Sequence, residues 1–92
     1  NQKKKLKNKR ISIMKELLIQ IIQAIVDKPD EVDIKLIEGE EDIKIYELRV
    51  GDGDFGKVIG KRGKNIMAIR TWLNAASAKS RDDKRTVLEV IE

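Results

Sequence analysis

One short segment, 58–66 with the sequence VIGKRGKNI, constrains the fold of this chain more than any other. Two glycines, Gly60 and Gly63, enclose a pair of cations; an aliphatic pair precedes them, and residues with a helical period follow. Because glycine has no Cβ, such a loop lets a sugar-phosphate backbone approach the main chain closely. Lys61 and Arg62 would attract phosphates, and the start of the following helix would add N–H donors. The segment therefore predicts a phosphate-binding loop between two helices.

The distribution of charge supports this prediction better than the net charge of +4 does. Residues 1–13 hold six Lys/Arg and no acidic residue, so the remaining residues, 14–92, carry a net charge of −2. Within that slightly acidic part, the segment 57–70 has no acidic residue and five cations, Lys57, Lys61, Arg62, Lys64 and Arg70. A cationic segment in an acidic domain indicates a surface that faces phosphates.

Hydrophobic periodicity predicts an α+β fold in the order helix, strand, strand, short helix, long helix, strand. Apolar residues at helical spacing indicate a first helix over about 13–27, which Pro29 ends. Alternation and turn residues place two strands at about 31–38 and 43–50, a short helix at 54–59, a long helix from the glycine loop to about 79, and a last strand at 85–91. The expected architecture is a three-stranded sheet packed on helices.

Two local features of these elements need separate interpretation. In the second strand, Ile43 and Ile45 lie on one parity, whereas Tyr46 and Leu48 lie on the other, which predicts a bulge near residues 45–46. In the first helix, the apolar arc is unusually broad. Deep burial is the favoured explanation of this arc, and a second apolar surface for a partner is the alternative.

Residues 1–13 are polar and Lys-rich and have no apolar stripe, so we expect a basic, disordered N-terminal extension followed by one domain over 14–92. Met14 could be the natural initiator. Whether the extension is native stays open at this point. A solvated extension is favoured over a dedicated RNA-binding arm.

The residue types that are missing argue against an enzyme. With no Cys and no His, neither a thiolate nor a zinc site is expected, and no cofactor is implied. The segment 51–56, GDGDFG, has the G-x-G-x-x-G spacing, but Asp52 and Asp54 would place carboxylates where a pyrophosphate should lie. A turn followed by a helix capped by Asp54 explains it better. No run approaches the roughly 18 apolar residues of a membrane span.

The chain resembles a type II KH domain, and more narrowly the small bacterial single-KH-domain proteins of the KhpA type. The resemblance covers residues 14–91 and rests on the segment 58–64, on Ile69-Arg70-Thr71 with 73–76, on the opening 14–17, and on the hairpin 30–48. It implies that the four loop residues clamp RNA, flanked by further contacts. The expected RNA-binding residues are Lys57, Ile59, Gly60, Lys61, Arg62, Gly63, Lys64, Asn65 and Arg70.

The same resemblance implies a cytoplasmic protein that binds single-stranded RNA with low sequence specificity. It implies a role in post-transcriptional regulation linked to cell division, cell shape or envelope growth, with RNA chaperone activity. Self-association, or pairing with a second, larger KH protein of the Jag type, is also implied. A separate hypothesis from the residues is a partner surface at Trp72 with Ala68 and Ala75, where small side chains flank an indole.

Two other functions compete with RNA binding. The first is a KH-fold interaction module that acts mainly in dimer assembly. The second is a KH domain of a larger ribosome-assembly or transcription factor. Aromatic residues that could stack bases are scarce, since the chain has one Tyr, one Phe and one Trp. If bases are bound, we expect an aliphatic groove lined by Val58, Ile59, Ile66 and side chains of the second strand.

Overall fold

The computed structural model describes residues 2–38, 43–78 and 85–92 of the chain. Its elements follow the predicted order, with two short 3-10 turns added. In chain order they are α1 (Gln2–Ile25), η1 (Pro29–Glu31), β1 (Asp33–Glu38), β2 (Ile43–Arg49), α2 (Phe55–Ile59), η2 (Lys61–Gly63), α3 (Lys64–Ala78) and β3 (Arg85–Ile91).

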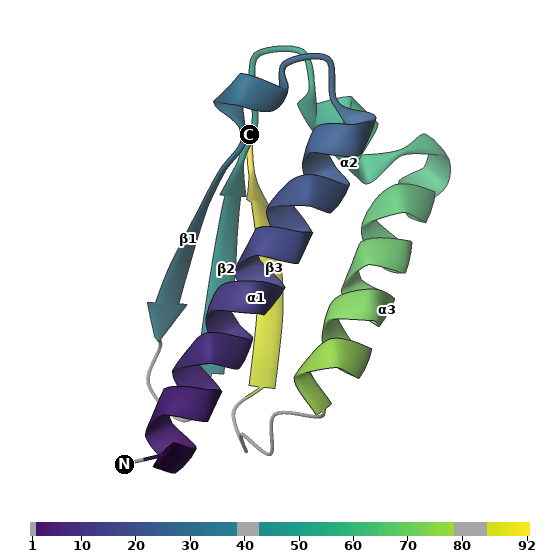
Figure 1. The fold of residues 1–92 in the computed structure, drawn as a ribbon. Coiled ribbons are helices and arrows are strands. Elements are labelled where there is room, and N and C mark those ends of the chain that lie inside the picture. Colours follow the sequence, from purple (N-terminus) through teal and green to yellow (C-terminus); the bar gives the residue numbers. More distant parts are fainter. Residues whose placement is uncertain (1, 39–42, 79–84) are drawn as a thin grey trace.

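The three strands form one mixed sheet in the order β1-β2-β3. β1 and β2 are antiparallel neighbours, whereas β2 and β3 are parallel. Figure 1 shows α1 and α3 side by side on one face of this sheet. A parallel pair needs a crossover connection, and α2, η2 and α3 provide it. The expected α+β fold, with a three-stranded sheet packed on helices, is confirmed.

The predicted bulge in β2 is wrong. The strand pairs without interruption on both sides, from Ile43 opposite Arg85 to Arg49 opposite Asp33. Tyr46 and Leu48 are buried, while Ile43 and Ile45 are half-buried on the other parity. The two isoleucines do not need to face the helices, because Ile45 lies in register with apolar neighbours on both sides, Ile37 of β1 and Val87 of β3.

The hydrophobic core lies between the sheet and the helices and contains one aromatic side chain. It consists of Met14, Leu18, Ile22, Ile34, Tyr46, Leu48, Val58, Ile66, Ile69, Leu73 and Leu88. Every described helix longer than one turn and every strand contributes to it. The loop between α2 and α3 is therefore fixed on both sides by buried residues, Val58 before it and Ile66 after it.

Helix α1 differs from the sequence expectation in where it begins. It begins at Gln2 and continues through the basic segment that was expected to be disordered. This segment contains neither Gly nor Pro and is rich in Lys, which has a high helix propensity, so a helix packed from Met14 onward can continue through it. The division of the chain into an extension (1–13) and a domain (14–92) stays a prediction.

The broad apolar arc of α1 is divided between core and surface. Ile19, Ile21 and Val26 are half-buried against the core, as deep burial of the helix predicts. Ile13 and Leu17, by contrast, are 48% and 43% exposed. Burial within the domain thus explains only part of the arc.

A buried carboxylate joins the end of α1 to the start of α2. Asp54 is 1% exposed, and its two oxygens accept hydrogen bonds from the backbone N–H groups of Asp27 (3.1 Å) and Lys28 (2.8 Å). Asp54 occupies the N-cap position of α2, but its side chain makes no capping bond there. Burial alone would raise the pKa of Asp54, but these two hydrogen bonds and the nearby ammonium groups of Lys57 and Lys28 lower it.

We expect Asp54→Asn to lower the melting temperature by at least about 5 °C at pH 7, because an amide cannot accept from both N–H groups. A carboxyl whose pKa is lowered by folding contributes fully above its unfolded pKa of about 4, and this contribution is lost as the pH falls further. The difference in melting temperature between parent and variant, followed by circular dichroism, should therefore narrow below about pH 4. A difference that is independent of pH would contradict this role of the charge.

Candidate functional site

The loop between α2 and α3 has a backbone that only glycine adopts easily at two of its positions. We call residues 60–63 the GXXG loop. Gly60 has φ 77° and ψ 170°, and Gly63 has φ 75°. Arg62 also has a positive φ, 57°, which is uncommon for a residue with a side chain. Two backbone bonds close the turn, from Gly60 N–H to the carbonyl of Gly56 (2.8 Å) and from Gly63 N–H to the carbonyl of Gly60 (3.0 Å).

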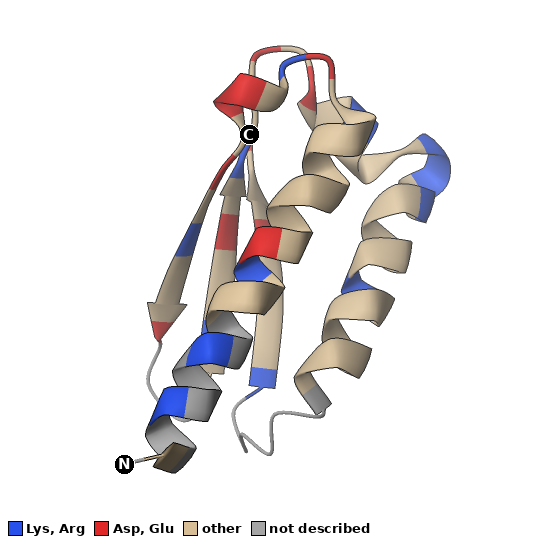
Figure 2. Ribbon diagram, in the orientation of Figure 1, with Lys and Arg blue, Asp and Glu red and all other residues tan. Residues whose placement is uncertain are grey.

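The GXXG loop presents unused donors and positive charge on the same surface. Neither Lys61 nor Arg62 donates its backbone N–H to an acceptor in the part of the chain that the structure describes. The side chains of Lys61, Arg62 and Lys64 are exposed. In Figure 2 the end of the molecule between α2 and α3 is blue. Free N–H groups beside cations are a suitable arrangement for binding phosphate oxygens.

Two of the predicted contact residues have other partners in this structure. The Lys57 ammonium lies 3.0 Å from a carboxylate oxygen of Asp27, and this hydrogen bond and charge raise the pKa of Lys57. Ile59 is half-buried against the core. Lys57 therefore differs from the loop cations in that its charge is already partly neutralised.

Asn65 and Arg70 also make contacts within the domain. The Asn65 side-chain amide donates to the backbone carbonyl of Lys57 at 2.8 Å. The Arg70 guanidinium donates to the backbone carbonyl of Leu88 at 3.1 Å, which connects α3 to β3. Since the guanidinium has five N–H donors, Arg70 can make this bond and still bind a ligand.

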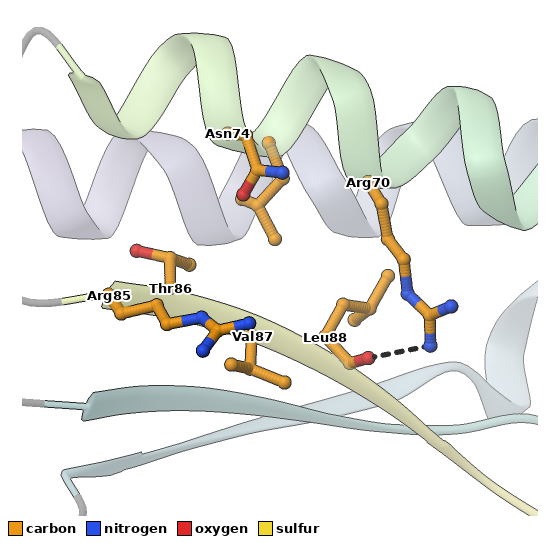
Figure 3. Close-up of a pocket in the computed structure, with 7 residues that line it drawn as sticks. Arg70, Asn74, Arg85, Thr86, Val87 and Leu88 are labelled. Atoms are coloured by element: carbon orange, nitrogen blue, oxygen red, sulfur yellow. Dashed lines mark hydrogen bonds between the residues drawn. The ribbon is translucent and has the colours of Figure 1, made fainter.

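A hollow of about 300 Å³ lies between α3 and β3. Figure 3 shows Arg70 and Asn74 extending from α3 toward the strand. We call it the α3–β3 hollow, and its lining residues are Arg70, Leu73, Asn74, Arg85, Thr86, Val87 and Leu88. No side-chain hydrogen bond of Asn74, Arg85 or Thr86 is found among the described residues. The hollow thus combines an apolar surface with polar side chains, of which Asn74, Arg85 and Thr86 have no side-chain bond within the described part of the chain.

Burial contradicts part of the expected groove, which was predicted to be lined by Val58, Ile59, Ile66 and side chains of the second strand. Val58 is 0% exposed and Ile66 is 5% exposed, so both belong to the core. β2 is the central strand of the sheet. The hollow lies instead beside β3, which is an edge strand. Arg70 of this lining was predicted from the sequence, whereas the residues of β3 were missed because nothing local in the segment 85–91 indicates an edge strand next to α3.

The structure keeps the proposed partner surface apart from the α3–β3 hollow. Ala68 and Ala75 are exposed on α3, and Trp72 is half-buried against the core. None of the three lines the hollow. Met67, which is 63% exposed, adds to the uncharged surface of this helix.

A comparison with protein-family models gives a match to the family described as "KhpA/KhpB, KH domain" over residues 15–90. The chain belongs to this KH-domain family. The resemblance inferred from the residues is thereby confirmed, and so is the assignment of the α+β fold to a KH domain.

Curated members of the KhpA/KhpB family match almost over their whole length. "RNA-binding protein KhpA" of Chlamydia trachomatis serovar D is 51% identical over 79 residues, 86% of this chain and 97% of the relative. The protein of the same name from Clostridium acetobutylicum is 49% identical over 78 residues, 85% of this chain and 100% of the relative. The protein of the same name from Borreliella burgdorferi is 47% identical over 77 residues, which is 84% of this chain and 90% of the relative. No solved structure matches the chain significantly.

Residues 2–38, 43–78 and 85–92 contain neither a candidate membrane-spanning helix nor a cluster that could hold a metal ion. None of the helices in these ranges combines the length and the hydrophobicity that a membrane span requires. In the same ranges, no group of three or more His, Cys, Asp or Glu side chains is placed to hold a metal ion.

The two glycines of the loop should differ in how much they tolerate a methyl group. Both have positive φ, but a Cβ at Gly60 would lie 2.6 Å from Cγ of Asn65, whereas a Cβ at Gly63 meets only Ile66 Cγ2 at 3.9 Å. We expect Gly60→Ala to cost about 2 kcal/mol or more of unfolding free energy, and Gly63→Ala to cost clearly less. Urea denaturation of both variants measures this difference, and equal costs would contradict the described packing at Gly60.

Proposed function

We propose that this chain binds single-stranded RNA, with the phosphates on the GXXG loop and the bases in the α3–β3 hollow. The loop carries the proposal, because its free N–H groups and exposed cations lie together between α2 and α3. The curated relatives, which are named RNA-binding proteins, support it. The role is binding and not catalysis.

Phosphates contact the backbone at Gly60 and Gly63 and the free N–H groups between them, while Lys61 and Arg62 hold positive charge close by. Ile59, Lys64 and Arg70 flank the strand, with a smaller contribution from Lys57, and Asn65 lies directly after the loop with its amide bonded to the Lys57 carbonyl. About four nucleotides are clamped, as in other KH domains. Three engaged cations, Lys61, Arg62 and Lys64, give a log–log salt slope of about −2 on a single strand.

The α3–β3 hollow supports base binding of low sequence specificity. Leu73, Val87 and Leu88 offer an apolar surface for the face of a base, and Asn74 and Thr86 offer hydrogen bonds to its edge. Tyr46 is 1% exposed and cannot stack on a base, and Trp72 lies outside the hollow. Without aromatic stacking, aliphatic contacts and a few polar groups discriminate weakly between bases.

The cellular part of the proposal follows from the family. A cytoplasmic RNA-binding protein of this kind acts in post-transcriptional regulation, with RNA chaperone activity, and affects cell division, cell shape or envelope growth. No described residue identifies the target RNAs.

A direct test uses the full chain with Lys61→Asp and Arg62→Asp together, beside a control with Lys5→Asp and Lys9→Asp. The control changes the net charge by the same amount at two exposed positions of α1. We expect the loop variant to lose on the order of tenfold or more in affinity for a short single-stranded RNA, measured by fluorescence anisotropy, and the control to lose much less. Equal losses in the two variants would show that charge alone binds the RNA.

The second proposal is that the uncharged surface of α3 at Ala68, Trp72 and Ala75 pairs the domain with a second copy or with a larger KH protein of the Jag type. Exposed Ala68, Ala75 and Met67 beside a half-buried Trp72 support it. We expect Ala68→Asp with Ala75→Asp to convert a dimer into a monomer in multi-angle light scattering, while short-RNA affinity stays within about twofold. A parent chain that is monomeric alone and with the larger KH protein would contradict this proposal.

A further inference from the structure

Asn65 connects the two sides of the GXXG loop. The loop begins after α2, whose last carbonyls have no partner within so short a helix. The carbonyl of Gly56 accepts from Gly60 N–H, which closes the end of α2. The next carbonyl, that of Lys57, accepts from the side chain of Asn65 in the first turn of α3, at 2.8 Å. One side chain thus joins the end of α2 to the start of α3.

The same side chain also packs against the first residue of the loop. A Cβ at Gly60 would lie 2.6 Å from Cγ and 2.8 Å from Cβ and Nδ2 of Asn65, so the amide occupies the space beside the Gly60 backbone. Asn65 therefore contacts the chain before the loop by a hydrogen bond and at the loop by packing. Within the described residues, the N–H groups of Lys61 and Arg62 have no acceptor beside it.

The loop needs such support because its backbone is unfavourable. Gly60, Arg62 and Gly63 all have positive φ, and Arg62 is not a glycine. A backbone of this kind persists only where its surroundings hold it in place. Apart from backbone bonds within the turn, the bond from the Asn65 amide is the one side-chain hydrogen bond that spans residues 60–63 in the described part of the chain.

We propose that Asn65 is a positioning residue of the RNA clamp, which keeps the GXXG loop in the conformation that accepts phosphates. This inference rests on the proposed function and assigns Asn65 a role that a direct contact with RNA does not describe. If only a fraction of the loops is competent, the apparent association rate falls by that fraction, while a bound complex dissociates as before. Loss of a direct contact would instead raise the dissociation rate.

The experiment compares the full chain with Asn65→Leu and Asn65→Ala, both of which remove the donor. Leucine keeps the volume beside Gly60, and alanine avoids any clash there. We expect the association rate with a short single-stranded RNA, measured by stopped-flow fluorescence, to fall roughly three- to tenfold, with the dissociation rate unchanged within about twofold. In the free protein, hydrogen exchange at the two bonded amides of the loop, Gly60 and Gly63, should become faster.

Thr71→Val is the matched control. Thr71 Oγ1 donates to the backbone carbonyl of Met67 at 2.9 Å, so the variant removes one exposed side-chain-to-backbone bond from the same helix, away from the loop. We expect it to leave both rate constants and the exchange at 60–63 unchanged.

Each other outcome overturns a specific statement. A raised dissociation rate with an unchanged association rate would make Asn65 a direct contact. Faster exchange at 60–63 without any change in the rates would show that the clamp does not depend on this bond. If the Lys61→Asp, Arg62→Asp variant binds as the parent does, the clamp itself is wrong, whatever Asn65 does.

Discussion

The parallel pairing of β2 and β3 determines where the candidate site lies. Neighbouring parallel strands run in the same direction, so the chain has to return along the sheet between them. In this protein the return consists of α2, the GXXG loop and α3, and α3 contributes Ile66, Ile69 and Leu73 to the core. The loop consequently lies beyond the end of β2, and the returning helix lies beside the edge strand β3 (Figure 1). The positions of the loop and of the α3–β3 hollow thus both follow from the parallel pairing of β2 and β3.

The Asp54 carboxylate connects the segment around the loop to the end of α1. Because it accepts from the N–H groups of Asp27 and Lys28, the end of the first helix is fixed to the start of α2, a few residues before the loop. Lys57 continues the connection through its ion pair with Asp27, and the carbonyl of the same residue accepts from Asn65. Four polar side chains thus connect the buried carboxylate to the loop, and their bonds are present in the protein without a ligand. They are Asp54, Asp27, Lys57 and Asn65. A loop held in this way loses little conformational entropy on binding.

Local patterns in the sequence were sufficient to predict the glycine loop and the order of the helices and strands. The glycine spacing, the cations at Lys61 and Arg62, and the periodicity of the helices are properties of neighbouring residues, and the structure agrees with them. The groove could not be found in this way, because it depends on β3 lying at the edge beside α3, a contact between residues far apart in sequence. The same holds for Asp54, which was expected to cap α2 but bonds to residues 27 and 28. The assumed bulge failed since Ile45 finds apolar neighbours on both sides in the sheet.

The charged residues of the domain explain attraction of an RNA backbone but not a preference among bases. Residues 14–92 have a net charge of −2, so within this part of the chain a polyanion is attracted mainly to the cationic segment 57–70. Within that segment Lys57 is paired with Asp27, and Arg70 is directed to the Leu88 carbonyl, which leaves Lys61, Arg62 and Lys64 as the exposed cations nearest the loop. The α3–β3 hollow contributes uncharged groups at Leu73, Asn74 and Thr86. Affinity that comes from phosphates is independent of sequence, whereas a preference among bases requires contacts with the bases, which our proposal assigns to the hollow. Under the proposed function, a cationic loop combined with a hollow whose lining has no aromatic side chain favours binding to many RNAs over recognition of one.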